Sequence, residues 1–256
     1  MIRRGRPMRR LAGLALAFAT MLLCAPAAHA RDANALWRVV HDGCVPDQQL
    51  HASPSPCAEV SLDGGWAVLK DRRGTTQFLL IPTARVTGIE DPAILSPASP
   101  NYFAAAWAAR GLVSERAGRV LPRDALSLAI NSPFGRSQDQ LHIHIDCLRA
   151  DLPATLRRLA GAIGPDWATL PGGLLGHPYR ALRLTDSGLD RVNPFRLLAA
   201  APDIGPAGLR PWTLVVAGTE SGFVLLADRA DPATGDRAEG EELQDHDCAL
   251  AHQPPG

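Results

Sequence analysis

A run of alternating polar and apolar residues, "QLHIHIDCL" at 140–148, constrains the fold of this chain more than any other feature. Side chains two residues apart on a β-strand point to the same face of a sheet. The polar residues at positions 140, 142, 144 and 146 would therefore share one face, and the apolar residues between them the other. This pattern predicts a strand whose apolar face packs on a core, so the chain needs a sheet with a covering layer.

Short apolar runs between turn residues, and runs with helical spacing, predict the other elements. The predicted strands lie at 66–71, 77–83 and 125–132 and in a hairpin at 211–229. The predicted helices lie at 34–44, 95–112 and 151–163, the second capped near Ser99 with Pro100 in its first turn. Residues 44–57 are expected to form a Pro-rich loop, and the polar end of the chain to fray except where Cys248 holds it. Together these elements predict an α+β fold, an antiparallel sheet with helices packed on it.

The hairpins predicted at 66–83 and 211–229 have a similar outline. This similarity favours an internal repeat, with a second, degenerate half of the domain. The alternative is that any two hairpins look alike, and both interpretations stay open at the level of sequence.

The first thirty residues have the pattern of a bacterial secretory signal. Five arginines occur in the first ten residues, an apolar run extends from Leu11 to about Ala28, and Ala28-His29-Ala30 has the small-x-small form of a cleavage site. The apolar run, at ~18 residues, is also nearly long enough to remain as a membrane anchor. Residues 1–30 are therefore predicted to be a signal peptide or an N-terminal membrane anchor. Residues 31–256 are predicted to be an exported domain, either periplasmic or anchored to the inner membrane and facing the periplasm.

The charge of the exported part argues against nucleic acid as a partner. Removing residues 1–30 takes away five arginines and no acids, so 26 basic residues become 21 against 26 acidic ones, and the net charge falls from 0 to −5. No basic field remains that would attract a polyphosphate backbone. The oligomeric state is not evident from the sequence.

Four cysteines remain after export, namely Cys44, Cys57, Cys147 and Cys248. An even number in an oxidising compartment favours two disulfides, for which three pairings exist. Cys44 and Cys57 bracket the Pro-rich loop and form the natural local pair, which leaves Cys147 to meet Cys248. A zinc site is the alternative, but the spacings contain no CxxC pair.

The two histidines on one strand face allow three interpretations. A metal site would use His142 and His144 as ligands with Asp146 continuing the row, but His41, His51, His177 and His246 are scattered and add no ligand cluster. The histidines would otherwise be ordinary polar residues of a half-buried strand. In the third interpretation, one imidazole is a nucleophile and its neighbour a helper.

The turn before the strand favours the third interpretation. It contains Asn131, Gly135, Arg136, Ser137 and Gln138 in the segment "NSPFGRSQ". Amide, guanidinium and hydroxyl donors, with a glycine that permits close backbone approach, are the groups that hold phosphate oxygens. An imidazole beside a bound phosphate can attack phosphorus and form a phosphohistidine.

These residues resemble a known family. "SQDQLHIHIDC", preceded by "LAINS" and "FLLIPTARVTG", is similar to the histidine-triad (HIT) superfamily of nucleotide hydrolases and transferases. Within that superfamily the chain resembles the CDP-diacylglycerol pyrophosphatase family, through an ordered set of segments from "LWRVVHDGC" to "EELQDHDC" that includes all four cysteines. The resemblance covers residues 35–248 and implies a HIT-like fold, with the repeat as a degenerate HIT-like half.

The resemblance implies particular roles for the residues of the row. The superfamily motif is His-x-His-x-His, in which the middle histidine is the nucleophile; Gln140 occupies the first position, His142 the middle one and His144 the third. Gln140 departs from the pattern, although its amide both donates and accepts as a neutral imidazole does. Ser137 matches a position at which the superfamily often has a phosphate-contacting serine, and Asn131 matches the asparagine that ends the preceding strand. Arg136 stands where glutamine is more common.

The implied activity is hydrolysis of CDP-diacylglycerol, a lipid nucleotide drawn from a membrane surface, to CMP and phosphatidate without a metal or other cofactor. His142 would form a cytidylyl intermediate, His144 would contact the leaving group, and Asn131, Arg136, Ser137 and Gln138 would hold phosphate oxygens. Lys70 and Arg85, at the ends of strands, are further candidates for the pyrophosphate. Two alternatives remain: a HIT-like pyrophosphohydrolase or nucleotidyl transferase with a soluble substrate, and a non-catalytic lipid- or nucleotide-binding protein.

Overall fold

The histidine strand lies inside one antiparallel sheet, in a computed structural model that describes residues 1–2, 32–185, 188–205 and 208–252. Residues 32–256 form one compact unit. The predicted signal or anchor at residues 1–30 falls almost entirely outside the described residues. No helix in the described part of the chain is both long and apolar enough to cross a membrane.

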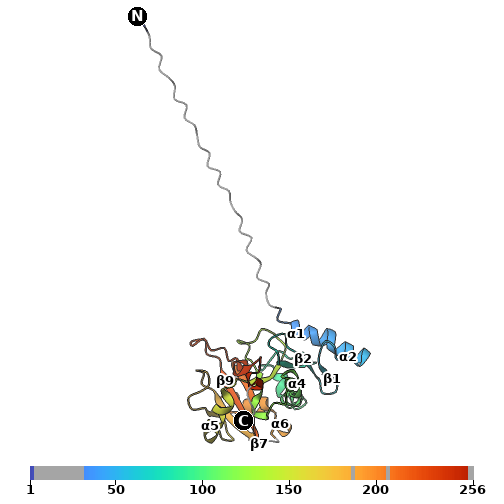
Figure 1. The fold of residues 1–256 in the computed structure, drawn as a ribbon, viewed down its shortest axis with the longest axis vertical. Helices are drawn as coiled ribbons and strands as arrows, with labels where there is room; N and C mark the ends of the chain where they lie inside the picture. Colours follow the sequence, from blue (N-terminus) through green and yellow to red (C-terminus); the bar gives the residue numbers. More distant parts are fainter. Residues whose placement is uncertain (3–31, 186–187, 206–207, 253–256) are drawn as a thin grey trace. The chain divides into compact units, whose positions relative to one another are not determined.

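The described strands form a single ten-stranded sheet in the order β1-β2-β3-β5-β4-β8-β9-β7-β6, with β10 paired to β5. In Figure 1, β1 and β2 lie on the right of this domain and β9 on the left. All the pairs are antiparallel, which confirms the predicted α+β class. The strands are β1 Glu59–Ser61, β2 Trp66–Lys70, β3 Phe78–Pro82, β4 Leu126–Ile130, β5 Ile143–Leu148, β6 Ala168–Thr169, β7 Arg180–Thr185, β8 Trp212–Thr219, β9 Gly222–Arg229 and β10 Gln244–Asp245.

The helices pack on both faces of the sheet. The α-helices are α1 Ala35–Arg38, α2 Val45–His51, α3 Tyr102–Ala108, α4 Gly111–Arg116, α5 Leu152–Leu159, α6 Gly188–Arg191 and α7 Pro194–Ala200. A π-helix, η1 Val39–Cys44, joins α1 to α2. The 3₁₀ turns are η2 Pro92–Leu95, η3 Arg123–Ala125, η4 Ala160–Ala162, η6 Gly240–Leu243 and η7 Ala249–His252.

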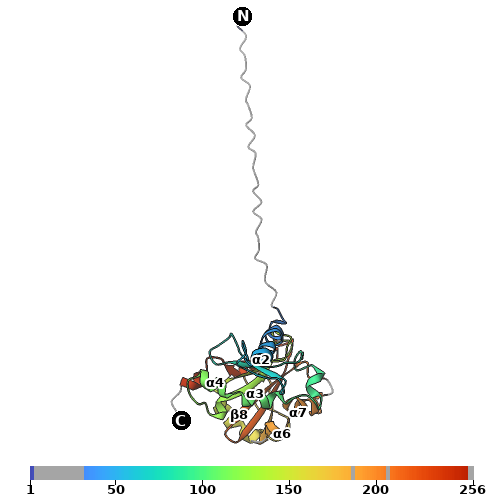
Figure 2. The same ribbon diagram turned by 90° about the vertical axis from the view of Figure 1, so that its right-hand side faces the viewer.

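The two largest cores lie on opposite faces of the sheet, and a third, smaller one lies where η1 packs on β2 and β3. The larger one joins α3, α4, α6 and α7 to the apolar side of β5, including Ile143, Ile145 and Cys147 (Figure 2). The second core joins α5 to residues such as Leu148 and Leu226. Since side chains alternate along a strand, His144 and Asp146 point to the α5 face. The predicted alternation thus separates the helix-covered core from a face that holds the polar row.

The order of elements occurs twice along the chain. The sequence β2, β3, α3, α4, β4, β5 is followed by β6, β7, α6, α7, β8, β9, and the two sets meet at the β4–β8 pair in mirror order. This supports the expected second, degenerate half. It also corrects which hairpins correspond, because β8–β9 occupies the place of β4–β5 and not that of β2–β3 as the sequence suggested.

Two predicted helices have different limits. The first extends beyond residue 44 through η1 and α2, so most of the predicted Pro-rich loop is helical. Pro46 lies at the start of α2, directly after the π-helix η1, where the helical hydrogen-bond pattern changes. The helix predicted at 95–112 is divided into α3 and α4, and its cap is Asn101, whose side chain accepts from the Ala104 N–H at 3.2 Å. Ser99 is not the cap, because the helix begins only at Tyr102 and the Ser99 hydroxyl donates to the Pro100 carbonyl instead of accepting from an N–H of the first turn.

The described part of the tail is held well beyond Cys248, at which alone the sequence predicted it to be fixed. β10 pairs with β5, and the predicted disulfides Cys147–Cys248 and Cys44–Cys57 are both present, with Cα–Cα distances of 5.3 and 5.6 Å. Leu243 and Cys248 are fully buried. These contacts place Glu241 and His246 on the polar face of the histidine strand, while Cys248 joins Cys147 in the core on the other face.

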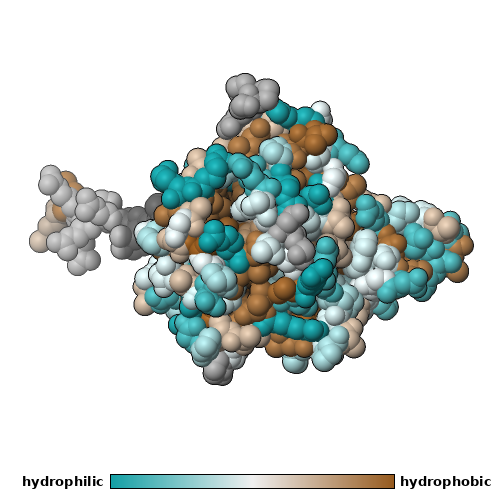
Figure 3. All heavy atoms as spheres, turned by 90° about the horizontal axis from the view of Figure 1, so that it is seen from below, coloured by the Kyte–Doolittle hydropathy of each residue, from teal (hydrophilic) through white to brown (hydrophobic). Residues whose placement is uncertain are grey.

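Large apolar side chains at the surface are scattered. Those that are exposed include Leu50, Leu62, Val120 and Phe134, which belong to different parts of the fold. On the face shown in Figure 3, hydrophobic residues are separated by hydrophilic ones. Isolated apolar residues of this kind are normal on a protein surface.

Candidate active site

His142 lies just before β5 and is held by its own backbone. Its Nδ1 is 2.6 Å from the carbonyl oxygen of Gln140, and its side chain is largely buried. Because a carbonyl can only accept, Nδ1 carries the hydrogen and Nε2 keeps its lone pair. Burial lowers the pKa of His142 to about 4, and the neighbouring His144 adds to this effect. His142 is therefore a neutral imidazole at neutral pH, in the tautomer that a nucleophilic Nε2 requires.

His144 lies beside His142, with the two ring centroids 5.0 Å apart. Its Nδ1 is 2.8 Å from Nε2 of Gln77, so the hydrogen of the neutral ring lies on Nε2, which faces Oε2 of Glu241 at 3.5 Å. Burial lowers the pKa of His144, while the Glu241 carboxylate opposes that shift. His144 thus presents an N–H beside the lone pair of His142.

Gln140 supports His142 through its backbone and not through its side chain. The Gln140 amide donates to the carbonyls of Pro82 and Ala84, at 3.0 and 2.9 Å, and its oxygen accepts from the Val86 N–H. The residue is fully buried. These bonds turn the chain away from β5, which explains why the strand begins at Ile143 and not at the predicted residue 140.

Glu241 comes from η6 and faces the histidine row. Its Oε2 accepts from Asn131 at 2.9 Å, its backbone N–H donates to the Asn131 side chain at 3.1 Å, and its Oε1 is 3.1 Å from Nε2 of His246. Burial alone would raise the pKa of Glu241, but His144, His246 and Asn131 hold it well below its usual range. Glu241 is therefore an ionised carboxylate behind His144.

His246 links Glu241 to Asp146. Its Nδ1 is 2.8 Å from Oδ2 of Asp146, whose Oδ1 accepts from Thr76 and from the Cys147 N–H. The pKa of His246 is raised to about 10, first by the bond to Asp146 and then by Glu241. An imidazolium thus lies between two carboxylates and completes a polar chain from Asp146 to His144.

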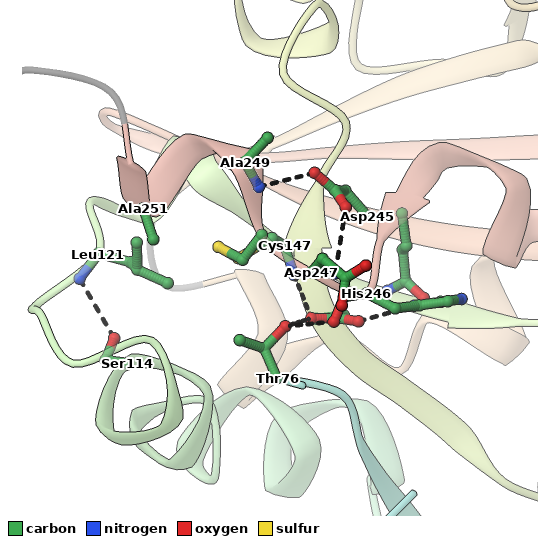
Figure 4. Close-up of a disulfide and its surroundings, with 12 residues drawn as sticks. Thr76, Ser114, Leu121, Cys147, Asp245, His246, Asp247, Ala249 and Ala251 are labelled. Carbon is green, nitrogen blue, oxygen red and sulfur yellow. Dashed lines mark hydrogen bonds and ion pairs between the residues drawn. A yellow bond between two sulfur atoms is a disulfide. The ribbon is translucent and has the colours of Figure 1, made fainter. Parts of the chain in front are cut away.

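The turn between β2 and β3 covers His246. The backbone N–H groups of Thr75 and Thr76 donate to the His246 carbonyl, at 2.8 and 3.2 Å. Gly74 has a φ of +59°, and a Cβ there would lie 2.3 Å from Cβ of His246. Figure 4 shows Thr76 and His246 beside Cys147, the residue that joins this part of the tail to β5.

The other predicted site residues are engaged elsewhere. Arg136 forms a two-bond ion pair with Glu90, at 2.7 and 2.6 Å. Gln138 donates to the Asp32 carbonyl and accepts from the Leu36 N–H, which ties the N-terminal helix to the loop. Lys70 donates to carbonyls in the β2–β3 turn. Among these candidates Ser137 is exposed.

Arg85 also lies away from the row of polar residues at positions 140, 142, 144 and 146. Its guanidinium donates to the Asn34 side chain and stacks over Trp37 at 5.4 Å. A cavity of about 550 Å³ is lined mainly by α4 and the segment that follows it, and none of the residues of the row lines it. The row lies on the opposite face of the sheet, away from that cavity.

Sequence reasoning missed Glu241 and His246. His246 was judged to be an isolated histidine, and Glu241 was one acid in a polar tail. The signal that placed them was the Cys147–Cys248 pairing, because it brings the residues before Cys248 next to Asp146. The contact joins positions 100 residues apart, so no local spacing reveals it.

Comparison with known proteins gives consistent results. The family model described as CDP-diacylglycerol pyrophosphatase matches residues 31–252. The chain is 45% identical over 225 residues to a CDP-diacylglycerol pyrophosphatase of Yersinia pestis, and the alignment covers 87% of each protein.

Proposed function

Because this chain belongs to the CDP-diacylglycerol pyrophosphatase family, we propose that it hydrolyses the pyrophosphate bond of CDP-diacylglycerol, with His142 as the nucleophile. The products would be CMP and phosphatidate. The observation that carries the proposal is the 2.6 Å bond from His142 Nδ1 to the Gln140 carbonyl, which leaves Nε2 free to attack. Two disulfides fit an enzyme that works outside the cytoplasm, in an oxidising compartment.

In the first step Nε2 of His142 attacks the phosphorus of the CMP half. A P–N bond forms, the P–O bond to phosphatidate breaks, and phosphatidate leaves as an anion. A phosphate monoester, with a second pKa of about 6, leaves without a strong general acid. The N–H of His144 is positioned to donate to an oxygen on the leaving side.

In the second step water attacks the cytidylyl group, the P–N bond breaks, and CMP is released. The attacking water loses its proton to bulk water, and Nε2 of His142 regains its lone pair as the P–N bond breaks. Asp146 and His246 keep Glu241 in place behind His144. The two histidines thus have different roles, and the tail supplies the support that a first triad histidine would otherwise share.

The phosphate oxygens need donors that the substrate can reach. Asn131 and Arg136 already bind carboxylates, so we assign them the task of holding Glu241 and the 131–139 loop. Ser137, on the exposed part of that loop, remains the candidate for direct contact with a phosphate. This division revises the expectation that all three contact the substrate.

The test is CMP release from CDP-diacylglycerol in mixed micelles. His142→Ala is expected to lower the rate at least about a thousandfold, as removal of a nucleophile does, while His144→Ala keeps measurable activity. His51→Ala, at an exposed histidine, is the control and is expected to match the wild type. An inactive His144 variant beside an active His142 variant would reverse the assigned roles.

Two further measurements separate the alternatives. A cytidine-labelled protein adduct, trapped by alkaline denaturation, is expected for the wild type and not for His142→Ala. Turnover of CDP-choline or dinucleoside polyphosphates in preference to the lipid nucleotide would indicate a soluble substrate. Binding of CDP-diacylglycerol without an adduct or turnover would indicate a non-catalytic binding protein.

A further inference from the structure

A second cluster of ionisable side chains lies in the other half of the sheet. It consists of His177, Asp228 and Asp236, whose potential ligand atoms all lie within 4.8 Å of one another. Asp228 is on β9, and its cross-strand partner is Thr213. In the repeated topology β9 takes the place of β5, and matching Thr213 with Ser127 matches Asp228 with Asp146. The cluster is therefore the counterpart of the polar row, without its two histidines.

Asp228 is buried without a partner. Only 1% of the residue is exposed, and neither carboxylate oxygen has a hydrogen-bond partner within the described chain. The neighbouring side chains of the α5 face, such as Leu226, are apolar. An unpaired carboxylate in such a place is costly, so either a proton or a cation must accompany it.

Asp236 and His177 complete the cluster from loops. The Ala238 N–H donates to Oδ1 of Asp236 at 2.8 Å, which fixes the carboxylate, and Oδ2 lies 3.9 Å from Nδ1 of His177. Burial and the nearby Asp236 raise the pKa of Asp228 to about 7. Two carboxylates with an imidazole at their open side form a donor set that a divalent cation can use.

More negative charge surrounds the cluster. Oε1 of Glu242 lies 2.8 Å from Nδ1 of His177 and accepts from the Tyr179 hydroxyl at 2.8 Å. Three carboxylates thus face one imidazole. Arg237 also lines the cavity beside the cluster, but its guanidinium pairs with Glu239 at 3.0 Å and donates to the Phe134 carbonyl.

A small cavity leads to the cluster from outside. Its volume is about 160 Å³, and its lining includes His177, Asp236, Glu239 and Glu242. A water molecule occupies about 30 Å³ of liquid, so the cavity has room for an ion with several waters. His177 is 31% exposed, so a cation entering by this route meets it on the way to the buried Asp228.

We propose that His177, Asp228 and Asp236 bind one divalent transition-metal ion, with Zn²⁺ as the ion whose preference for imidazole and carboxylate ligands fits best. The site is separate from the histidine row. Strands β4 and β8 lie between β5 and β9, and three strand spacings amount to about 14 Å. An ion here would hold η6 through the contact of Glu242 with His177, and Glu241 of the same turn faces His144.

Calorimetric titration of the full chain, free of metal and of any polyhistidine tag, tests the proposal with Zn²⁺ as the probe. One Zn²⁺ per chain is expected to bind to the wild type, and Mg²⁺ is expected not to. Asp228→Asn and His177→Gln are each expected to raise the Kd for Zn²⁺ at least about tenfold. His177→Gln changes a partly exposed side chain, so it keeps the test valid if the buried Asp228 variant fails to fold.

Two controls locate the ion. His51→Gln removes an exposed histidine 3.9 Å from Asp47 and is expected to leave Zn²⁺ binding unchanged. His142→Asn tests whether the ion belongs to the histidine row instead. Zn²⁺ binding that is lost in His142→Asn and kept in the other variants overturns the proposal. The proposal is equally overturned if the wild type binds no Zn²⁺, the result expected if Asp228 and Asp236 share a proton.

Discussion

At the scale of single residues, the chemistry of the site depends on the protonation of His142. The Gln140 carbonyl fixes the tautomer and burial keeps the ring neutral. This carbonyl belongs to the backbone, so any residue at position 140 can provide it. The side chain of Gln140 instead secures the segment from Pro82 to Val86. The departure from the histidine triad at this position therefore leaves the orientation of His142 intact.

The activity is expected to fall to half as the pH is lowered to about 4. The pKa of His142 is lowered to about 4, and the ring must be neutral to attack. The measurement is kcat/KM against pH, which reports the free enzyme. Tryptophan fluorescence at each pH monitors the fold. If kcat/KM instead falls to half of its maximum near pH 6.5 while the fold stays intact, His142 is not a desolvated nucleophile.

His246→Gln is expected to lower stability in a pH-dependent manner. The folded-state pKa of His246 is raised to about 10 from an ordinary value of 6.5. The stabilisation is therefore fully present below pH 6.5 and is lost as the pH rises through about 10. Urea unfolding at pH 6, 8 and 10 should show the difference between wild type and variant shrinking. His51→Gln is the control, and a pH-independent difference for His246→Gln would refute the charged bridge.

At the scale of elements, the site depends on the hairpin of β2 and β3 meeting the tail. The turn donates two backbone N–H groups to His246, and β10 pairs with β5 on the other side. The disulfide from Cys147 closes a separation of 101 residues, for which chain entropy alone predicts about 4.7 kcal/mol. The sequence pattern predicts no regular structure for this tail. In the structure, strand pairing, two hydrogen bonds from the β2–β3 turn and a disulfide hold it.

Gly74→Ala is expected to reduce both activity and stability. Its Cβ would lie 2.3 Å from Cβ of His246 and 2.5 Å from the carbonyl oxygen of that residue, so the turn must move away. Gly118→Ala is a matched control, because Gly118 also has a positive φ, of +70°, but has no atom within 4 Å of the added Cβ. Both variants carry the left-handed strain of about 1–2 kcal/mol. Equal activity and equal Tm in the two variants would show that the contact with His246 is unimportant.

At the scale of the whole molecule, the two halves of the sheet depend on each other. They join through β4 and β8, where Ser127 to Ile130 pair with Ala217 to Leu214. The first half holds His142 and His144, but Glu241 and His246 follow the second half along the chain. The proposed catalytic row is therefore complete only when the chain has returned across the sheet.

Cutting the chain between Pro165 and Asp166, in an exposed connection, is expected to leave activity intact while the pieces stay together. The Cys147–Cys248 disulfide joins the two fragments covalently, which a non-reducing gel can confirm. Fragment 32–165 expressed alone is expected to be inactive, since it lacks the tail and exposes β4 as an edge. Full CMP release by that fragment would show that the tail residues are dispensable.

The sequence by itself determined the class of fold, the two disulfides and the family. Alternation along 140–148 separates a core face from a polar face, and local spacing singles out Cys44 and Cys57, so the α+β class and the pairing were predicted and are confirmed. The strand pattern and the Cys44–Cys57 pair depend on neighbours along the chain, and the Cys147–Cys248 pair followed as the remaining one. Only the tertiary structure decided which groups surround His144, because the contacts of Glu241 and His246 join residues about 100 positions apart through backbone geometry that no spacing encodes. The tertiary structure also showed that Arg136 pairs with Glu90 and that the side chain of Gln140 bonds to the 82–86 segment. Residue type alone does not give such partners, because they depend on which groups lie close together in the fold.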